Sequence, residues 1–185
     1  MRVFSWRQPQ KPDREGIINL VNEALQNDSC AQFAEKTLAT LSSSKNPTLK
    51  GGDLFSIFKL FLEKGGTFTR TPPPGSAGYG SPIGSIPNGA SISMATFSNP
   101  ALQNWSDAVT VIDELFHLSG SKEWYSDEEL AKAVHAIPEY AALTKLDPSQ
   151  NIFDPNYAGK DKDKDAAYSN YFHDIERRLC TVTKP

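Results

Sequence analysis

This chain of 185 residues has few histidines and few cysteines, and neither charge is present in large excess. It holds three histidines and two cysteines, and its 19 lysines and arginines against 22 aspartates and glutamates leave a net charge of −3. Without a basic excess or a basic stripe, the composition argues against nucleic-acid binding. Hydrophobic residues at 38% and charged residues at 22% are typical of a soluble globular protein. We therefore expect a single domain over residues 1–185, long enough for a sizeable core.

Long hydrophobic runs are also absent. No apolar stretch approaches the roughly 20 residues of a membrane-spanning helix. The first ten residues, Met1 to Gln10, lack the apolar centre of a signal peptide. We therefore expect no membrane span, and two alternatives stay open for the chain: a cytosolic protein, or a mature segment cut from a longer one.

The two cysteines, Cys30 and Cys180, lie near opposite ends of the chain, and no C-x-x-C motif is present. One interpretation is a disulfide that joins an N-terminal helix to the last helix, which would imply an oxidising, extracytoplasmic compartment. The other interpretation is a pair of ordinary buried thiols. A Cα separation above roughly 7 Å would exclude the disulfide.

Apolar spacing predicts an α+β fold, a mostly helical single domain with a small β-sheet. Residues 1–12 are expected to be a loosely ordered N-terminal segment, and the proline-, glycine- and serine-rich stretch 72–89 a long surface loop. Alternating or β-branched residues predict strands at 67–71 and 90–97. Helices are expected at 13–27, 30–41, 53–64, 104–120, 126–137 and 166–179.

The most informative segment is NWSDAVTVIDELFHLSG, residues 104–120. Placed on a helix at 100° per residue, its apolar residues share one half of the surface, and we expect Ile112, Leu115 and Phe116 to be buried. Asp113 and His117 project as neighbours on the other half, because they are four residues apart. We expect this polar stripe to border a cleft, not open solvent.

Asp113-Glu114-Leu115-Phe116-His117 resembles the H-E-x-x-H helix of the zincins, a family of zinc-dependent metallopeptidases, with aspartate in place of the first histidine. The resemblance covers roughly 25 residues and depends on two matched motif positions and their apolar setting. It implies a zincin-like fold, in which a strand such as 90–97 runs along the substrate cleft.

The resemblance also implies a set of site residues. His117 and Asp113 would bind zinc, and Glu114 would act on the zinc-bound water as general base. The third ligand would follow the helix, where Asp127 comes ten residues after His117; His135 is the alternative third ligand. The implied function is a metallopeptidase-like hydrolase that acts on a peptide or protein substrate.

Aspartate at position 113 weakens that expectation. A carboxylate in place of a neutral imidazole lowers the net charge of the ion, so its bound water is less acidic. Oxygen ligands also favour harder metals such as manganese or calcium. We therefore expect weak zinc binding and low or absent peptidase activity. Tyr125, Tyr157 and Tyr168 are candidate donors to an oxyanion, and the sequence does not choose among them.

Two blander interpretations stay open. The first is a zincin-like domain of a larger secreted protein that has lost catalysis and serves as a binding or structural module. The second is a helical interaction domain without a site, in which Asp113 and His117 are an ordinary solvated pair on the polar face of an amphipathic helix. Asp127 would then be a residue that favours the first turn of a helix through its charge alone.

Overall fold

The computed structural model describes residues 11–41, 53–70, 81–83, 86, 89–94, 102–120, 124–144, 151–154 and 161–182. For 81–83 and 161–163 only the backbone is described. The predicted loose segment 1–12 and the predicted loop 72–89 therefore lie largely outside the described residues. Tyr157, one of the three candidate oxyanion donors, lies outside them altogether.

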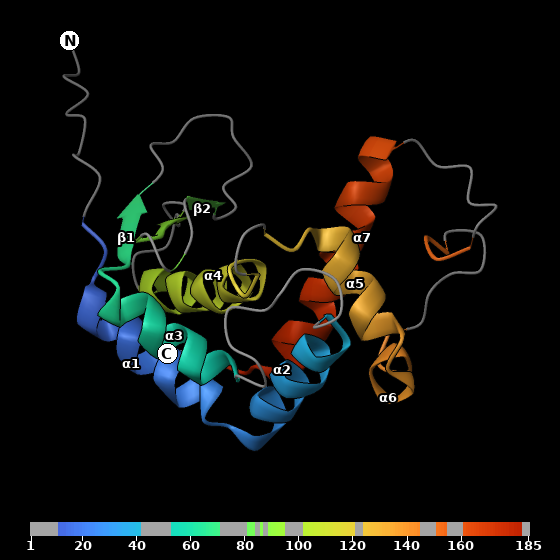
Figure 1. Cartoon of the computed structure of the whole chain (residues 1–185), viewed down its shortest axis with the longest axis horizontal. Coiled ribbons are helices and arrows are strands. Elements are labelled where there is room, and N and C mark those ends of the chain that lie inside the picture. The colour runs from blue at the N-terminus through green and yellow to red at the C-terminus, as the bar shows by residue number, and fades with distance from the viewer. Residues whose placement is uncertain are drawn as a thin grey trace, which may run out of the picture.

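Helices make up most of the described chain, as predicted for an α+β domain with a small sheet (Figure 1). The elements in chain order are α1 (Arg14–Leu25), α2 (Asp28–Leu41), α3 (Leu54–Glu63), β1 (Thr67–Arg70), β2 (Ser81–Ile83), β3 (Ser91–Met94), α4 (Gln103–His117), α5 (Asp127–His135), α6 (Pro138–Ala141) and α7 (Asp161–Leu179).

The sheet has the strand order β1-β3-β2. The predicted strands at 67–71 and 90–97 are neighbours in it, since β1 runs parallel to β3 with Thr67 opposite Ser91. β2 pairs antiparallel with the other side of β3 and falls inside the segment 72–89, so the loop prediction was wrong there. Pro82 and the surrounding glycines hide the strand from pattern analysis, and an edge strand tolerates proline because one side of it needs no ladder hydrogen bond.

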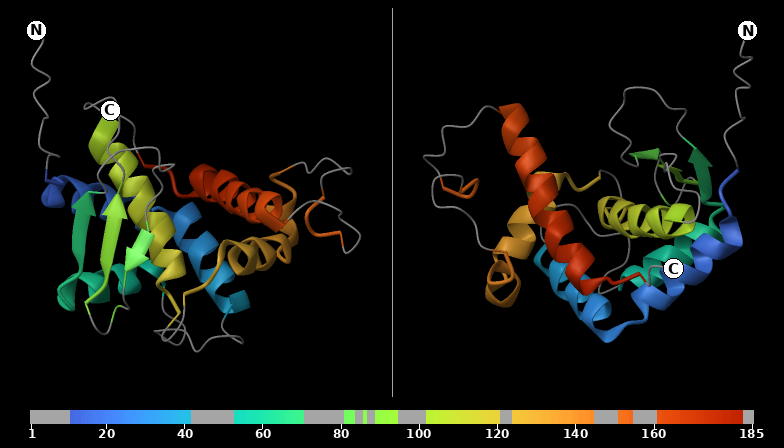
Figure 2. Two further views of the ribbon diagram at one scale, coloured as in Figure 1. Left: turned by 90° about the horizontal axis from the view of Figure 1, so that it is seen from above. Right: turned by 180° about the vertical axis from the view of Figure 1, so that it is seen from behind.

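Helix α4 is the central element. It lies along the sheet and contacts β2 and β3, and it also packs against α1, α3, α5 and α7 (Figures 1 and 2). The predicted apolar half faces this core: Ile112, Leu115 and Phe116 are all 0% exposed. Burial of such side chains supplies most of the stabilisation of a helix of this length, because its own backbone hydrogen bonds add little in water. The polar stripe of α4 is thereby held in a fixed orientation.

The helix ends follow the predictions at some positions and depart from them at others. Ser126 and Glu129 form a capping box at the start of α5. Helix α4 begins at Gln103 without a side-chain cap, although Asn104 beside it is a residue type that caps helices well. The Asn104 amide instead donates to Asp13, the N-cap of α1. Helix α7 begins at residue 161 and not at the predicted residue 166.

Cys30 and Cys180 form a disulfide, with their Cα atoms 4.4 Å apart. The disulfide interpretation is therefore confirmed, and the bond ties α2 to the residue that follows α7. It is compatible with an extracellular location, where disulfides persist. Among the described helices, none is long and apolar enough to cross a membrane.

Candidate metal site

Six ionisable side chains meet where α4, α5 and α7 pack together, and we refer to them as the polar cluster. Helix α4 supplies three members, α7 supplies two, and the first residue of α5 supplies one. The members are Asp113, Glu114, His117, Asp127, His173 and Glu176.

Three members of the cluster come from one turn of α4. Asp113, Glu114 and His117 each offer a ligand atom, and these atoms all lie within 4.8 Å of one another. The four-residue spacing of Asp113 and His117 places them on one face of the helix, while the apolar face behind them is fully buried. This part of the site is therefore built by local helical geometry, as the sequence predicted.

The ring of His117 is oriented by the backbone. Its Nδ1 lies 2.5 Å from the carbonyl oxygen of Tyr125, which can only accept, so Nδ1 carries the proton and donates. Its Nε2 lies 3.5 Å from Oδ1 of Asp127. A histidine whose Nδ1–H is held by a carbonyl is the usual arrangement of a metal-binding imidazole. Nε2 and Asp127 therefore face each other in a way that suits a proton or a cation between them.

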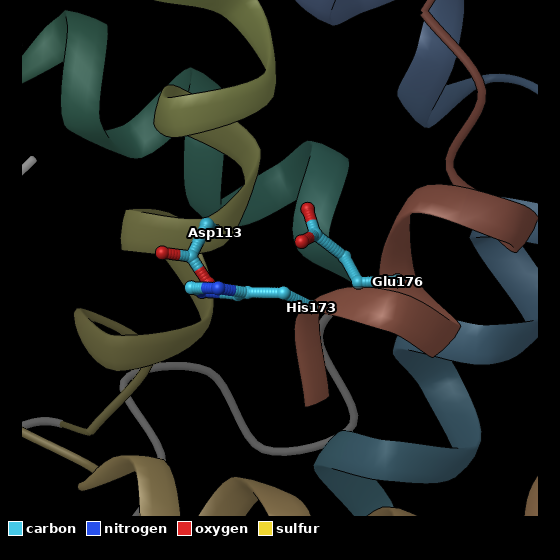
Figure 3. A group of neighbouring side chains, drawn as sticks. All are labelled: Asp113, His173 and Glu176. Atoms are coloured by element: carbon cyan, nitrogen blue, oxygen red, sulfur yellow. The ribbon is translucent and has the colours of Figure 1, made fainter. Parts of the chain in front are cut away.

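Helix α7 completes the cluster. His173 Nε2 lies 2.8 Å from Oδ1 of Asp113, and Glu176 lies three residues further along the same helix. Asp113, His173 and Glu176 form a second group whose ligand atoms all lie within 4.8 Å of one another. Figure 3 shows the Asp113 carboxylate against the imidazole of His173, with the Glu176 side chain extending from α7 towards α4. Asp113 thus belongs to both groups.

Two carboxyl groups of the cluster are buried without a complete set of partners. Glu114 is 3% exposed and Glu176 is 2% exposed, and Oε2 of each has no hydrogen-bond partner. Burial, reinforced by the charges of Asp113 and Asp127, raises the pKa of Glu114 to about 9. Burial also raises the pKa of Glu176, with Asp113 adding to the effect. An uncompensated buried carboxylate is costly, and a cation beside it removes that cost.

The other members show the same competition between burial and charge. Burial raises the pKa of Asp127, and His117 opposes the shift. Burial lowers the pKa of His173, but the hydrogen bond to Asp113 and the charge of that carboxylate outweigh burial, so the net shift is upward. The cluster therefore retains protons when no cation is bound, and positive charge is what its carboxylates lack.

The polar stripe of α4 does not lie on an open surface. The side chains of Asp113, His117 and His173 are 14%, 14% and 13% exposed, and that of Asp127 is 37% exposed. Solvent therefore reaches the cluster chiefly beside Asp127. Of the cavities lined by described residues, one of about 490 Å³ lies along β1 and one of about 110 Å³ between α2 and α3, and no cluster residue lines either. A cleft beside the stripe stays a prediction.

The alternative metal ligand and the described candidate oxyanion donors lie outside the polar cluster or point away from it. His135, the alternative third ligand, stacks on Phe153 with ring centroids 3.8 Å apart, and its Nδ1 lies 3.1 Å from the hydroxyl of Tyr171. It belongs to an aromatic group and to neither metal-ligand group of the described chain. The hydroxyls of Tyr125 and Tyr168 donate to backbone carbonyls, so neither is aimed at the cluster.

Sequence reasoning missed His173 and Glu176. The signal was present, because the two residues are three apart on an amphipathic helix and therefore share a face. His173 is also one of only three histidines in the chain. What the sequence did not give is the packing of α7 against α4, which brings His173 to Asp113 across 60 residues of chain.

Comparisons of the chain with protein-family models, with curated proteins and with solved structures gave no match. The likeness to zincins therefore depends on the residues of α4 alone. The functional evidence for this chain lies in the geometry of the polar cluster and in the chemistry of its side chains.

Proposed function

We propose that this chain binds a divalent metal ion in the polar cluster and acts as a metallopeptidase-like hydrolase of peptide bonds, with low activity. The observation that carries the proposal is the buried carboxyl of Glu114 beside Asp113 and His117, one oxygen of which has no hydrogen-bond partner. Such a carboxyl is costly in a folded protein, and a neighbouring cation offsets the cost. The ligands of the ion are His117, Asp127 and Asp113.

One pair of donor atoms is already spaced like two ligands of one ion, while Asp127 lies outside the group that Asp113, Glu114 and His117 form and has to move towards Asp113 to complete the set. Two ligand atoms about 2.1 Å from a tetrahedral ion lie about 3.4 Å apart, and Nε2 of His117 lies 3.5 Å from Oδ1 of Asp127. The carbonyl of Tyr125 holds the His117 ring so that this nitrogen presents its lone pair. A nitrogen and several carboxylate oxygens make a set that zinc accepts and that manganese also suits.

When bound, a divalent ion supplies a Lewis acid and a water of lowered pKa. The chain supplies the rest. The charge of the ion would lower the raised pKa of Glu114, and the ionised carboxylate, next to the ligands, would then take a proton from water as a general base. Asp113 adds a negative charge where zincins have a neutral histidine, which keeps that water less acidic and the activity low. A peptide would approach the site beside Asp127, because Asp127 is more exposed than Asp113, His117 or His173.

The test separates metal binding from hydrolysis. Disulfide-intact protein is loaded with Zn²⁺ or Mn²⁺, its metal content is measured by elemental analysis, and cleavage of a mixed peptide library is followed by mass spectrometry. His117→Ala should lose the metal. Glu114→Gln should keep the metal and lose at least about a hundredfold in cleavage rate, the contribution of a general base. Glu128→Gln, one residue from Asp127 and paired with Lys132 on the surface, is the matched control. Absence of bound metal in the parent protein would refute the proposal.

A second candidate function is a catalytically inactive metal-binding or structural domain of a larger secreted protein. Two observations favour it: the aspartate at position 113, and the 3% exposure of Glu114, which limits access to the general base. The disulfide between Cys30 and Cys180 is compatible with secretion. Metal that binds at His117 without any peptide cleavage, in the parent and in Asp113→His, identifies this second function.

A further inference from the structure

The metal site of the proposed function leaves two members of the polar cluster, His173 and Glu176, without a role. Asp113, Glu114 and His117 form one group of ligand atoms, and Asp113, His173 and Glu176 form another. The two groups share a single residue, Asp113. A carboxylate has two oxygens, and each of them can bind a different ion, as carboxylates do in two-metal sites with ions about 3.5–4 Å apart.

The second group carries its own evidence for a ligand. The Glu176 side chain is 2% exposed, and its Oε2 has no hydrogen-bond partner. It extends from α7 towards α4, beside the Asp113–His173 contact (Figure 3). On the same helix, Asp174 is more exposed and forms an ion pair with Arg178, so a positive side chain of the protein already neutralises that carboxylate. A buried acceptor left open next to an imidazole and a second carboxylate matches a position for a metal ion.

The distances also fit. His173 Nε2 and Asp113 Oδ1 are 2.8 Å apart. Two adjacent ligands of an octahedral ion, each at about 2.1 Å, lie about 3.0 Å apart. An ion that replaces the proton between these two atoms therefore moves them only slightly. Glu176 then supplies the third donor, within 4.8 Å of both.

Charge and helical spacing point the same way. The cluster holds four carboxylates, those of Asp113, Glu114, Asp127 and Glu176, whose four negative charges balance two divalent cations. Its two imidazoles come from different helices. Helix α4 carries Glu114-x-x-His117 and α7 carries His173-x-x-Glu176, so each helix presents a carboxylate and an imidazole three residues apart. Helical proteins build two-metal carboxylate sites from Glu-x-x-His pairs on facing helices, together with further carboxylates.

We propose that the polar cluster is a two-metal centre, in which the carboxylate of Asp113 bridges one divalent ion held by His117 and Asp127 and a second held by His173 and Glu176. This inference rests on the proposed metal-binding function and extends it. The donor set of four carboxylates and two imidazoles favours metal ions that prefer oxygen ligands. Mn²⁺ and Fe²⁺ therefore bind more tightly here than in a nitrogen-rich site, where their affinities rank low among the divalent transition metals.

The experiment is a titration of the full, disulfide-intact chain with Mn²⁺ alone. Calorimetry and elemental analysis give the number of ions bound, and electron paramagnetic resonance reports whether two Mn²⁺ ions are coupled through a shared ligand. We expect two ions per chain and a coupled spectrum. Glu176→Gln, which keeps the shape of the side chain, and His173→Gln should each leave one ion and an uncoupled spectrum. Asp174→Asn, next to His173 on the same helix, is the matched control and should retain two.

The outcomes separate this inference from the proposed function. One ion that is unaffected by Glu176→Gln and His173→Gln overturns the two-metal centre and leaves the first site standing. One ion that requires both His117 and His173 also overturns it, because the cluster is then a single site. No bound ion in the parent chain refutes both. Circular dichroism and a thiol assay on every variant establish that fold and disulfide are intact, so that a lost ion reports a lost ligand.

Discussion

Helix α4 buries two acidic side chains, and the chain treats them in opposite ways. Asp107, near its start, is 1% exposed and fully partnered: Arg70 donates to both of its oxygens at 2.5 and 2.6 Å, and Gln103 donates at 2.8 Å. Glu114, two turns later, is 3% exposed and has an oxygen without a partner. The first carboxylate is neutralised from within, and under the proposed function a bound cation neutralises the second.

If the proposed function holds, this contrast separates a structural charge from a functional one. The buried ion pair of Arg70 and Asp107 links β1 to α4, and its hydrogen bonding is complete. Burial raises the pKa of the Glu114 carboxyl to about 9, and one of its oxygens has no hydrogen-bond partner. Raised pKa values and unpartnered acceptors gather at functional sites more often than elsewhere. The contrast can be tested by changing the partners of each carboxyl in turn.

Removing the internal partner should have the largest effect. Arg70→Ala leaves Asp107 buried and uncompensated, which typically costs about 3–5 kcal/mol of folding free energy. The loss is measured by urea unfolding. The double variant Arg70→Ala/Asp107→Asn should recover much of the stability, because no charge is then left buried. A loss below about 1 kcal/mol in Arg70→Ala, the size of an ordinary exposed pair, would mean that Asp107 is not held by this pair.

Adding a divalent metal ion, the proposed partner of the Glu114 carboxyl, should stabilise the folded protein. A divalent ion at a hundred times its dissociation constant stabilises a protein by about 2.7 kcal/mol, since it binds the folded state alone. We therefore expect Mn²⁺ or Zn²⁺ to raise the urea midpoint of the parent chain. The variant His117→Ala should respond less, and Asp107→Asn should respond as the parent does relative to its own metal-free stability. An unchanged midpoint in the parent would contradict the metal site.

Part of the fold and of the candidate site could be predicted from the sequence. The apolar face of α4 and the polar stripe of Asp113 and His117 follow from helical spacing, and the resemblance to zincins placed Asp127 near His117, whose Nε2 lies 3.5 Å from it. The Cys30–Cys180 disulfide followed from the packing of the first and last helices on one core. These features depend on local spacing or on there being only one possible partner.

The rest depends on packing between distant segments. His173 and Glu176 share a face of α7 by their spacing, but only the contact of α7 with α4 brings them to Asp113. His135 was an equally reasonable ligand in the sequence, and its stacking on Phe153 places it elsewhere. Strand β2 could not be predicted, because its segment is rich in proline and glycine. It is a strand because it pairs with β3, and its own residues do not favour that conformation.

The metal-free protein should lose stability as the pH rises. The pKa of Glu114 is raised from 4.5 to about 9 in the folded state, so the folded chain keeps a proton that the unfolded chain releases. Its contribution is fully present below pH 4.5 and is lost as the pH rises towards 9. The pKa values of Glu176 and His173 shift in the same direction. Each such group contributes at most about 1.4 kcal/mol per pH unit.

We therefore expect the unfolding free energy of the metal-free chain to fall by about 2 kcal/mol between about pH 5.5 and about pH 7.5, measured by urea titration with a chelator present. Glu114→Gln should flatten this dependence, because a neutral amide takes up no proton on folding. Glu139→Gln, on the exposed surface beside Lys36, is the control and should keep the parent slope. A parent slope of zero would show that Glu114 is compensated within the chain, as Asp107 is.

The smallest expected effect concerns Asp113. Asp113→His restores the first histidine of an H-E-x-x-H pattern and should tighten zinc binding about tenfold, equivalent to about 1.4 kcal/mol. It should also abolish binding of the second ion, since a neutral imidazole cannot bridge two ions as a carboxylate does. Asp113→Asn, similar in size but neutral, is the control and should weaken both positions. Zinc affinity is measured by titration in these variants, each with and without His117→Ala. The proposal fails if the zinc affinity of Asp113→His is unchanged, or if the gain in affinity survives the loss of His117. Asp113 and His117 then do not bind one ion, and the Glu114 oxygen without a hydrogen-bond partner needs another explanation.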